Sequence, residues 1–156
     1  MPRHLSIRRL TFLDDVSVSL VDNACLPHAG WTPRDFEDFL AVKGNAGLVA
    51  AWDRVLAGYL LYSVSCQKEV IGLRRLGVHP YFRRRGIGSR LLARVVRQAR
   101  PPSGTALFTL VHEHHLAMQL FLRANGFRAT RICRNFFDHG QAAGYLFEFT
   151  ARLEKP

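Results

Sequence analysis

The chain has 156 residues, a length typical of a single domain, and hydrophobic residues make up 48% of it, enough to pack a core. No apolar run approaches the roughly 20 residues that span a bilayer, and the N-terminus lacks the apolar stretch of a secretory signal. These features predict a cytoplasmic protein without a membrane segment. The net charge of +10 comes almost entirely from arginine and favours a polyanionic partner: a phosphorylated cofactor, RNA or an acidic protein surface.

The first part of the chain predicts one strand followed by two helices. Residues 5–11 alternate as a strand does, and the apolar residues of 12–26 recur near helical spacing. A second helix begins at Pro33, because Thr32 can cap its N-terminus and Asp35 is acidic at the third helical position.

The middle of the chain predicts three strands and a helix. The apolar runs 45–52 and 55–65 are separated only by Asp53 and Arg54, which is typical of a β-hairpin. A third run, 69–78, precedes a loop and then a helix with an apolar stripe on one side and arginines on the other. This helix ends before the prolines at 101–102.

The last part predicts strand, helix and two strands. Residues 105–112 form a short buried strand, and the helix of 115–127 ends with a left-handed exit at Asn125-Gly126. Two strands, 128–136 and 143–152, flank the polar turn Asp-His-Gly-Gln. The order is therefore strand, two helices, three strands, helix, strand, helix, two strands. It predicts one mixed α/β domain over residues 1–156 with a central sheet.

The stretch 78–95 places Arg83, Arg84 and Arg85 directly before Gly86 and Gly88, between a strand and a helix. The first turn of a helix exposes unpaired N–H groups that suit a phosphate. Glycines let the phosphate approach the backbone, and an anion relieves the repulsion among the arginines. We therefore expect a diphosphate-binding loop. It is no Walker loop, which needs Gly-Lys-Ser/Thr, and it lacks the third glycine and the acidic residue of a Rossmann fingerprint.

The longer pattern Val-x-Pro-x-x-Arg-x-x-Gly-x-Gly-x-x-Leu-Leu resembles the acetyl-CoA signature of the GNAT superfamily of N-acetyltransferases. The matching residues are Val78, Pro80, Arg83, Gly86, Gly88, Leu91 and Leu92. The Gly-Phe that ends the last helix and the order of elements are also similar to that family. Within it, the segments 30–40 and 134–149 most resemble the bacterial ribosomal-protein alanine acetyltransferases of the RimI type.

The resemblance implies a GNAT fold whose sheet is splayed open between the strand ending at Val78 and the strand 106–111. Acetyl-CoA is the implied cofactor, with pantetheine in the opening and the pyrophosphate on the backbone amides of 84–89. A backbone N–H near Val78 is the implied oxyanion donor. The implied cofactor-binding residues are Leu76, Gly77, Val78, Arg83, Arg84, Arg85, Gly86, Ile87, Gly88, Ser89 and His115.

Catalysis is where the chain departs from its relatives. They usually carry a tyrosine and a glutamate or histidine where this chain has Leu122 and Leu110, and leucine cannot move protons. His112 projects from the same strand face as Leu110, so it is a candidate base, unless it is simply a strand-end histidine facing solvent. Tyr81 could reach the sulfur or merely pack. Further possible bases are Glu69 and Glu113, each otherwise a solvated charge.

Metal binding is not expected. The run His-Glu-His-His at 112–115 does not continue as His-Glu-x-x-His, because position 116 is leucine. Cys25, Cys66 and Cys133 are odd in number and far apart, which predicts buried free thiols rather than disulfides or a zinc site.

For the acceptor, Trp31 and His139 are expected on opposite walls of the groove, although the aromatic residues near Trp31 also suit plain helix packing. The leading interpretation is transfer of an acetyl group to a primary amine, such as a ribosomal or other protein N-terminus, by a monomer or homodimer without direct nucleic-acid binding. Alternatives are a small-molecule amine acetyltransferase, a CoA-binding regulatory module with little or no turnover, and a basic RNA-associated protein.

Overall fold

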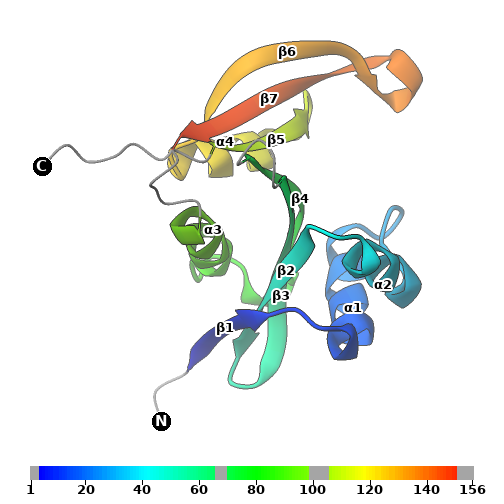
Figure 1. The fold of residues 1–156 in the computed structure, drawn as a ribbon, viewed down its shortest axis with the longest axis vertical. Coiled ribbons are helices and arrows are strands. Elements are labelled where there is room, and N and C mark those ends of the chain that lie inside the picture. Colours follow the sequence, from blue (N-terminus) through cyan, green and yellow to red (C-terminus); the bar gives the residue numbers. More distant parts are fainter. Residues whose placement is uncertain (1–3, 66–69, 99–105, 151–156) are drawn as a thin grey trace, which may run out of the picture.

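The computed structural model describes residues 4–65, 70–98 and 106–150. In this part of the chain, seven strands form one mixed sheet in the order β1-β2-β3-β4-β5-β7-β6 (Figure 1). The strands are β1 (Leu5–Arg9), β2 (Asn45–Trp52), β3 (Val55–Ser65), β4 (Val70–Val78), β5 (Ala106–His112), β6 (Arg128–Phe137) and β7 (Ala142–Thr150). The α-helices are α1 (Asp15–Cys25), α2 (Pro33–Ala41), α3 (Ile87–Gln98) and α4 (Leu116–Ala124). The α/β class and the order of elements predicted from the sequence are confirmed.

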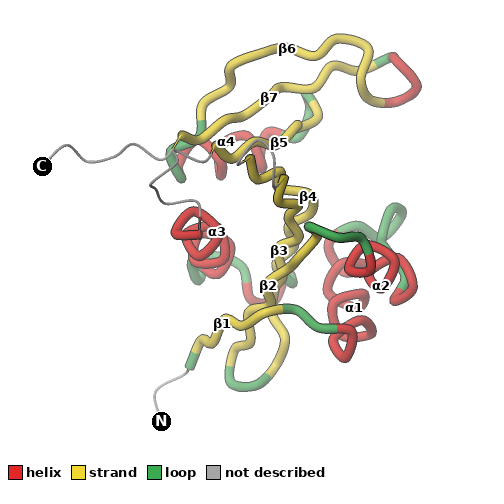
Figure 2. The backbone as a smooth tube through the Cα atoms, viewed as in Figure 1, coloured by secondary structure: helices red, strands yellow, loops and turns green. Residues whose placement is uncertain are grey.

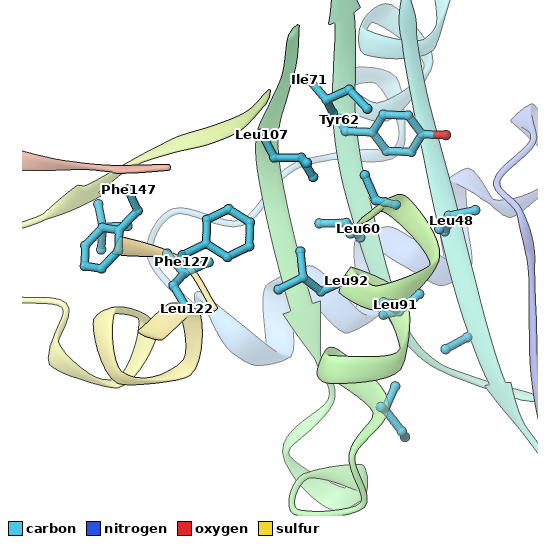
Figure 3. Packing of buried hydrophobic residues seen from close by; sticks show 14 of the residues in the cluster. Leu48, Leu60, Tyr62, Ile71, Leu91, Leu92, Leu107, Leu122, Phe127 and Phe147 are labelled. Carbon is cyan, nitrogen blue, oxygen red and sulfur yellow. The ribbon is translucent and has the colours of Figure 1, made fainter. Parts of the chain in front are cut away.

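The helices cover both faces of the sheet. Helices α1 and α2 lie on one side of β2–β4 and α3 lies on the other (Figure 2). One core cluster joins α3 and α4 to the sheet through residues such as Leu60, Leu91, Leu122 and Phe127, and Figure 3 shows these side chains packed together. A second cluster around Phe36 joins α1 and α2 to the opposite face. The sheet is therefore a shared wall between two apolar layers.

Local chemistry explains where the elements begin and turn. The Thr32 hydroxyl accepts the Asp35 N–H and the Asp35 carboxylate accepts the Thr32 N–H, so the predicted helix start at Pro33 is confirmed as a capping box. The turn between β2 and β3 has positive φ at both Asp53 (47°) and Arg54 (70°), as a tight hairpin turn requires.

Two predictions needed adjustment. Residues 12–26 do not form one continuous helix: a short 3₁₀ turn, Phe12–Asp14, precedes α1 because the Asp14 carboxylate accepts the Thr11 N–H and pairs with Arg8. The cysteines Cys25 and Cys133 are free, as predicted, but half-buried rather than buried, and Cys66 lies outside the described residues.

The pairing of β4 with β5 creates the feature that positions the site. Among the residues that the structure describes, these parallel strands pair at Val70↔Ala106, Ile71↔Leu107 and Gly72↔Phe108 and then diverge. Strand β5 continues its pairing with β7, while β4 continues with β3. The predicted splay between β4 and β5 is confirmed, and it opens the sheet between two apolar layers. None of the helices within the described ranges has the length and apolar character needed to cross a bilayer.

Candidate functional site

A cavity of about 490 Å³ lies where β4 passes through its loop into α3. Its lining comes from β4, the loop, the first turn of α3, the end of α1 and one side of α4. Ten of the eleven residues predicted to bind the cofactor line it: Leu76, Gly77, Val78, Arg83, Arg84, Gly86, Ile87, Gly88, Ser89 and His115. The structure thus brings together residues that are almost forty positions apart in the sequence.

The N-terminus of α3 opens into this cavity. The first N–H of the helix with an intrahelical partner is that of Arg90, which donates to the Gly86 carbonyl at 3.0 Å. Helix geometry therefore leaves the N–H groups of Ile87, Gly88 and Ser89 available. Gly86 has φ +74°, and a Cβ placed on it would have no atom within 4 Å, so the space in front of these donors is open. Such a turn can receive a phosphate.

The charges around the cavity favour an anion. Arg83 and Arg84 line it, and none of the described residues in its lining is acidic. The Arg83 Nε donates to the Val78 carbonyl at 3.0 Å, which ties the loop to the end of β4. Gly88 has a different role from Gly86, because a Cβ there would lie 3.3 Å from the ring of Phe121 on α4.

A second cavity, of about 360 Å³, lies in the opening between β4 and β5. It shares Leu26, Leu76, His115, Met118 and Phe121 with the first, so the two adjoin. Together they form a path from the positive end of α3 into the split sheet.

The backbone of β4 is turned toward this path. The His79 N–H donates to the Ala57 carbonyl, which makes this residue pair a hydrogen-bonded pair of the antiparallel ladder. Because such pairs alternate, the N–H and C=O groups of Val78 and Leu76 point away from β3, toward the opening. The Val78 carbonyl already accepts the Cys25 thiol (3.3 Å) and Arg83. The Leu76 groups and the Val78 N–H are thus placed to bond a ligand there.

The two leucines at the usual acid/base positions lie in different surroundings. Leu122 is 1% exposed and belongs to the core that joins α4 to the sheet. Leu110 lines the second cavity from β5. Neither side chain can carry a proton, so any proton transfer must use other groups.

His112, the predicted base, lines the second cavity and is held by two hydrogen bonds. Its Nδ1 accepts the His114 N–H at 3.1 Å, and its Nε2 lies 2.8 Å from Asp138 Oδ2. With Nδ1 accepting, the neutral ring carries its proton on Nε2 and donates it to the carboxylate. The imidazole therefore offers no free lone pair to the cavity, and the group that can accept a proton is Asp138, whose side chain is 64% exposed.

Asp138 carries no clear signal in the sequence. Its contact with His112 spans 26 residues and depends on the turn between β6 and β7. Asp138 and His139 both have left-handed backbone, with φ of 53° and 54°, followed by Gly140 at 88°. Non-glycine residues adopt this region at a cost, and clusters of it occur at functional sites. Phe137, at 5.3 Å from the His112 ring, completes this end of the second cavity.

Four other predicted residues, Tyr81, Arg85, His139 and Trp31, line neither cavity. The Tyr81 ring is 73% exposed and packs edge-on against Phe82. The Arg85 guanidinium lies over the ring of Trp52 at 5.0 Å, with Tyr81 and Phe82 nearby. His139 is exposed in the β6–β7 turn.

Trp31 is fixed by a buried ionic network that the sequence analysis missed. Asp22 on α1 is fully buried and pairs with Arg75 of β4 through two bonds of 2.8 Å. It also accepts the Trp31 N–H and the Tyr59 hydroxyl, while Arg75 covers the Trp31 ring at 4.7 Å. A signal was present: Asp22 occupies the same helical stripe as the buried residues Val18 and Val21.

This network shifts the ionisation of its members. Burial by itself raises the pKa of Asp22, but the hydrogen bonds from Arg75, Tyr59 and the Trp31 N–H outweigh it, and the pKa lies below its usual value. Burial and the carboxylate of Asp22 raise the pKa of Tyr59. The carboxylate therefore stays ionised at neutral pH and ties the loop between α1 and α2 to β4.

Within the ranges that the structure covers, no three histidine, cysteine, aspartate or glutamate side chains gather as metal ligands do. The Glu113 carboxylate accepts the Ala143 N–H at 3.3 Å and so links the end of β5 to β7. Glu69, another suggested base, lies outside the described residues.

Comparison with known proteins identifies the family. The profile of the Acetyltransferase (GNAT) family matches residues 16–127. Among curated protein sequences, none matches this chain. Several hundred solved structures share the fold, which agrees with the splayed seven-stranded sheet.

Three of them illustrate the similarity. The ribosomal-protein-S18-alanine N-acetyltransferase from Escherichia coli superposes with a TM-score of 0.82 at 16% identity, covering 97% of each chain. NAA60 from Arabidopsis thaliana in complex with acetyl-CoA gives 0.81 at 16% identity, covering 95% of this chain and 100% of that one. Ard1 from Thermoplasma volcanium gives 0.82 at 18% identity over 96% and 99%. At these identities the likeness is one of fold, while the matched family profile covers more than half of the chain. The chain therefore belongs to the acetyltransferase (GNAT) family, whose cofactor is acetyl-CoA.

Proposed function

We propose that this chain is a cytoplasmic, single-domain N-acetyltransferase of the RimI type, which transfers an acetyl group from acetyl-CoA to a protein N-terminal α-amine. The observation that carries the proposal is the continuous path from the open N-terminus of α3 into the split between β4 and β5. Its positive end suits a diphosphate, and its other end is lined by His112, whose partner Asp138 can accept a proton.

The residues present fit acetyl-CoA. The N–H groups of Ile87, Gly88 and Ser89, with Arg83 and Arg84, would hold the pyrophosphate, since the space in front of Gly86 is open. The backbone of Leu76 and Val78 would bond the pantetheine amides, and His115, at the junction of the two cavities, would bond the same arm.

When bound, acetyl-CoA supplies an acetyl thioester whose carbonyl carbon an uncharged amine attacks directly. The Val78 N–H, turned toward the opening, is the donor for the negative charge that develops on oxygen. Positioning of the two reactants accounts for much of the acceleration in a reaction of this kind. Tyr81, in the loop after β4, would reach the sulfur only by rotating from its exposed position.

The attacking amine must lose a proton. His112 and Asp138 act as a pair in this step: Nε2–H of His112 orients the carboxylate, and Asp138 takes the proton. The acceptor's α-ammonium group is complementary to this carboxylate. Trp31, held by Asp22 and Arg75, and His139, in the β6–β7 turn, flank the entry of the acceptor chain.

The protein acceptor is supported by the relatives of known activity. The E. coli structure is a ribosomal-protein alanine N-acetyltransferase, and NAA60 was solved with a bisubstrate analogue at 17% identity and a TM-score of 0.79. The test is release of CoA thiol from acetyl-CoA with three sets of acceptors: peptides with free N-termini, the same peptides with blocked N-termini but a free lysine, and small polyamines. Turnover with the first set alone supports the proposal, and turnover with polyamines alone contradicts it.

A second candidate, a CoA-binding module without turnover, is favoured by Leu110 and Leu122. Calorimetry separates it from the first. Tight binding of CoA together with no thiol release for any amine would identify a binding module, whereas measurable release would exclude it.

A further inference from the structure

Arg74 of β4 lines the second cavity, and the transfer step described above makes no use of it. Its side chain is exposed, whereas that of the next residue, Arg75, is 18% exposed and is paired with Asp22. Among the described residues Arg74 takes part in no ion pair, and the described lining of the cavity contains no aspartate or glutamate. The cavity therefore holds a guanidinium whose charge no described carboxylate balances.

A β-bulge explains why two consecutive arginines point to the same face of the sheet. Leu61 of β3 pairs with Arg75, and the next residue, Tyr62, pairs with Leu73. Arg74 is therefore an extra residue of β4 without a partner on β3. Bulges interrupt the alternation of a strand and re-aim its side chains, and they are frequent beside active sites.

A short series of hydrogen bonds fixes the direction of this guanidinium. The Arg74 Nε donates to Ser63 Oγ at 3.1 Å, and the Ser63 hydroxyl donates in turn to Asn45 Oδ1 at 2.6 Å. The Asn45 Nδ2 donates to the Phe39 carbonyl at the end of α2, so the series runs on the side of the sheet that α1 and α2 cover (Figure 2). In the described part of the chain Nε alone is engaged, which leaves both Nη groups of Arg74 for a ligand.

His112 lies on the same face of the sheet as Arg74. Gly72 pairs with Ser63 on one side and with Phe108 on the other, and a Cβ on Gly72 would lie 3.0 Å from the Phe108 ring. Phe108 therefore points to the face of Ser63, and strand alternation places His112, four residues further along β5, on that face too. The two strands thus present Arg74 and His112 to one cavity from its two sides.

We infer that Arg74 selects peptide acceptors with an acidic residue at the second or third position, an inference that rests on the acetyltransferase function proposed above. The two Nη groups of a guanidinium match the two oxygens of a carboxylate, and such a charged pair is stronger than a neutral hydrogen bond. Asp138 attracts the α-ammonium group of the acceptor, and Arg74 attracts the acid that follows it.

The size of the cavity sets the position of the acid. A round cavity of about 360 Å³ is about 9 Å across, which is the length of two to three extended residues. An acid further along the peptide would lie outside it. The charge of Arg74 also repels a second ammonium group, so it favours an acidic peptide over a polyamine.

The test compares six-residue peptides with amidated C-termini that carry glutamate or glutamine at the second or third position. Release of CoA thiol from acetyl-CoA is measured with each. We expect kcat/KM for the glutamate peptides to be about tenfold higher than for their glutamine counterparts. The difference should lie in KM, because Arg74 binds a part of the acceptor that does not react. Glutamate at the sixth position is the matched control and should give no preference.

Variants locate the effect. Arg74→Gln should remove the preference by slowing the glutamate peptides, while the glutamine peptides change little. Arg74→Glu should make peptides with lysine at the same positions better substrates than those with glutamate, a reversal that a merely structural role would not produce. Ser63→Ala frees Nε and should reduce the preference in part. Arg97→Gln, an exposed arginine near the end of α3, should keep it.

Circular dichroism and CoA calorimetry verify the fold and the cofactor site of each variant. Free alanine and alaninamide form one more pair of acceptors, because an amino acid also carries a carboxylate beside its amine. A preference confined to that pair would assign Arg74 to a small amino acid and overturn the inference.

Equal turnover of glutamate and glutamine peptides, or a preference that persists in Arg74→Gln, would likewise overturn it and leave the proposed acetyltransferase function in place. Absence of thiol release with every peptide would remove both.

Discussion

Gly86 illustrates how one residue serves both the backbone and the ligand. Its φ of +74° is a conformation that side chains with a Cβ rarely adopt, and the space a Cβ would enter is empty. The two constraints can be separated, because alanine introduces the backbone strain alone while glutamate adds a negative charge in front of the α3 amides.

We expect Gly86→Ala to cost about 1 kcal/mol of stability and to weaken CoA binding only a few-fold, since the strain of one left-handed residue is of this size. Gly86→Glu should abolish CoA binding while its melting temperature stays close to that of Gly86→Ala, since both carry the same backbone strain. Calorimetry and thermal unfolding of both variants measure the two effects. Equal CoA affinity in Gly86→Glu and the wild type would show that this loop does not bind the phosphates.

The pair of His112 and Asp138 gives a second prediction at the same scale. Asp138→Asn should lower kcat about tenfold to a hundredfold, because it keeps the shape of the turn but removes the proton acceptor. CoA affinity should stay the same, because neither side chain lines the phosphate end of the path. The double variant with His112→Gln should be no worse than the poorer single variant if the two residues act as one unit.

His114→Ala is the control for this pair. The bond to His112 Nδ1 comes from the His114 backbone, and its side chain is 81% exposed, so its removal should leave kcat unchanged. A loss of rate in His114→Ala equal to that in Asp138→Asn would contradict the assignment.

The sequence predicted one half of this pair and missed the other for a physical reason. Strand alternation is local, so it placed His112 on the cavity side of β5 from its distance to Leu110. The partner Asp138 reaches His112 only because the chain turns through three left-handed residues beyond β6. No local rule measures such a distance. For the same reason the pattern of arginines predicted a basic loop but could not tell that Arg85 stacks on Trp52.

At the scale of elements, the ion pair of Asp22 and Arg75, which we call the strut, links α1 to β4 and contributes strongly to the stability of the fold. Asp22 and Arg75 are mostly or fully buried, and each additional bond offsets the cost of removing the charges from water. The strut also fixes the loop that presents Trp31. Its loss therefore acts on both the stability of the fold and the shape of the acceptor entry.

Asp22→Asn should lower the free energy of unfolding by about 3 kcal/mol, because it leaves Arg75 without its charged partner. Denaturant unfolding measures this. Asp38→Asn is the matched control, since its pair with Arg34 is exposed on both sides and is expected to contribute less than about 1 kcal/mol. If both variants lose the same amount, the strut does not have the energetic role assigned to it.

The same strut makes stability depend on pH. The pKa of Asp22 is lowered in the folded state, so its contribution is complete above the unfolded pKa of about 3.9 and is lost as the pH falls through the lower, folded value. We expect acid unfolding of the wild type to show this loss below about pH 4. The free energy of unfolding of Asp22→Asn should change less with pH in that range than that of the wild type.

Elements were easier to predict than the way they meet. The bounds of β2 and β3 were predicted to the exact residue, because the apolar runs and the two-residue turn between them define the hairpin locally. The splay between β4 and β5 followed only from the resemblance to a known family, because no pattern in either strand tells where the pairing stops. The network of Asp22 joins residues up to 53 positions apart and is likewise invisible to periodicity.

At the scale of the whole molecule, the net charge of +10 is unevenly distributed. Six of the twelve acidic residues lie between positions 14 and 38, in and around α1 and α2. Between positions 79 and 134 there are eleven arginines and a single acidic residue, Glu113. The loop and the first turn of α3, which line the positive end of the cofactor path, fall in this basic segment. A long-range positive field therefore surrounds the place where the phosphates of CoA would bind.

This field gives a prediction that no single substitution tests. Exposed charges lose most of their mutual influence beyond about 10 Å at 0.1 M salt. The dissociation constant of CoA should therefore rise several-fold between low salt and 0.5 M sodium chloride, whereas that of pantetheine, which has no phosphate, should not change. Calorimetry with both ligands across the salt series measures the difference. Equal slopes for the two would mean that the arginines around α3 do not act on the phosphates, and the basic segment 79–134 would then need a different anionic partner.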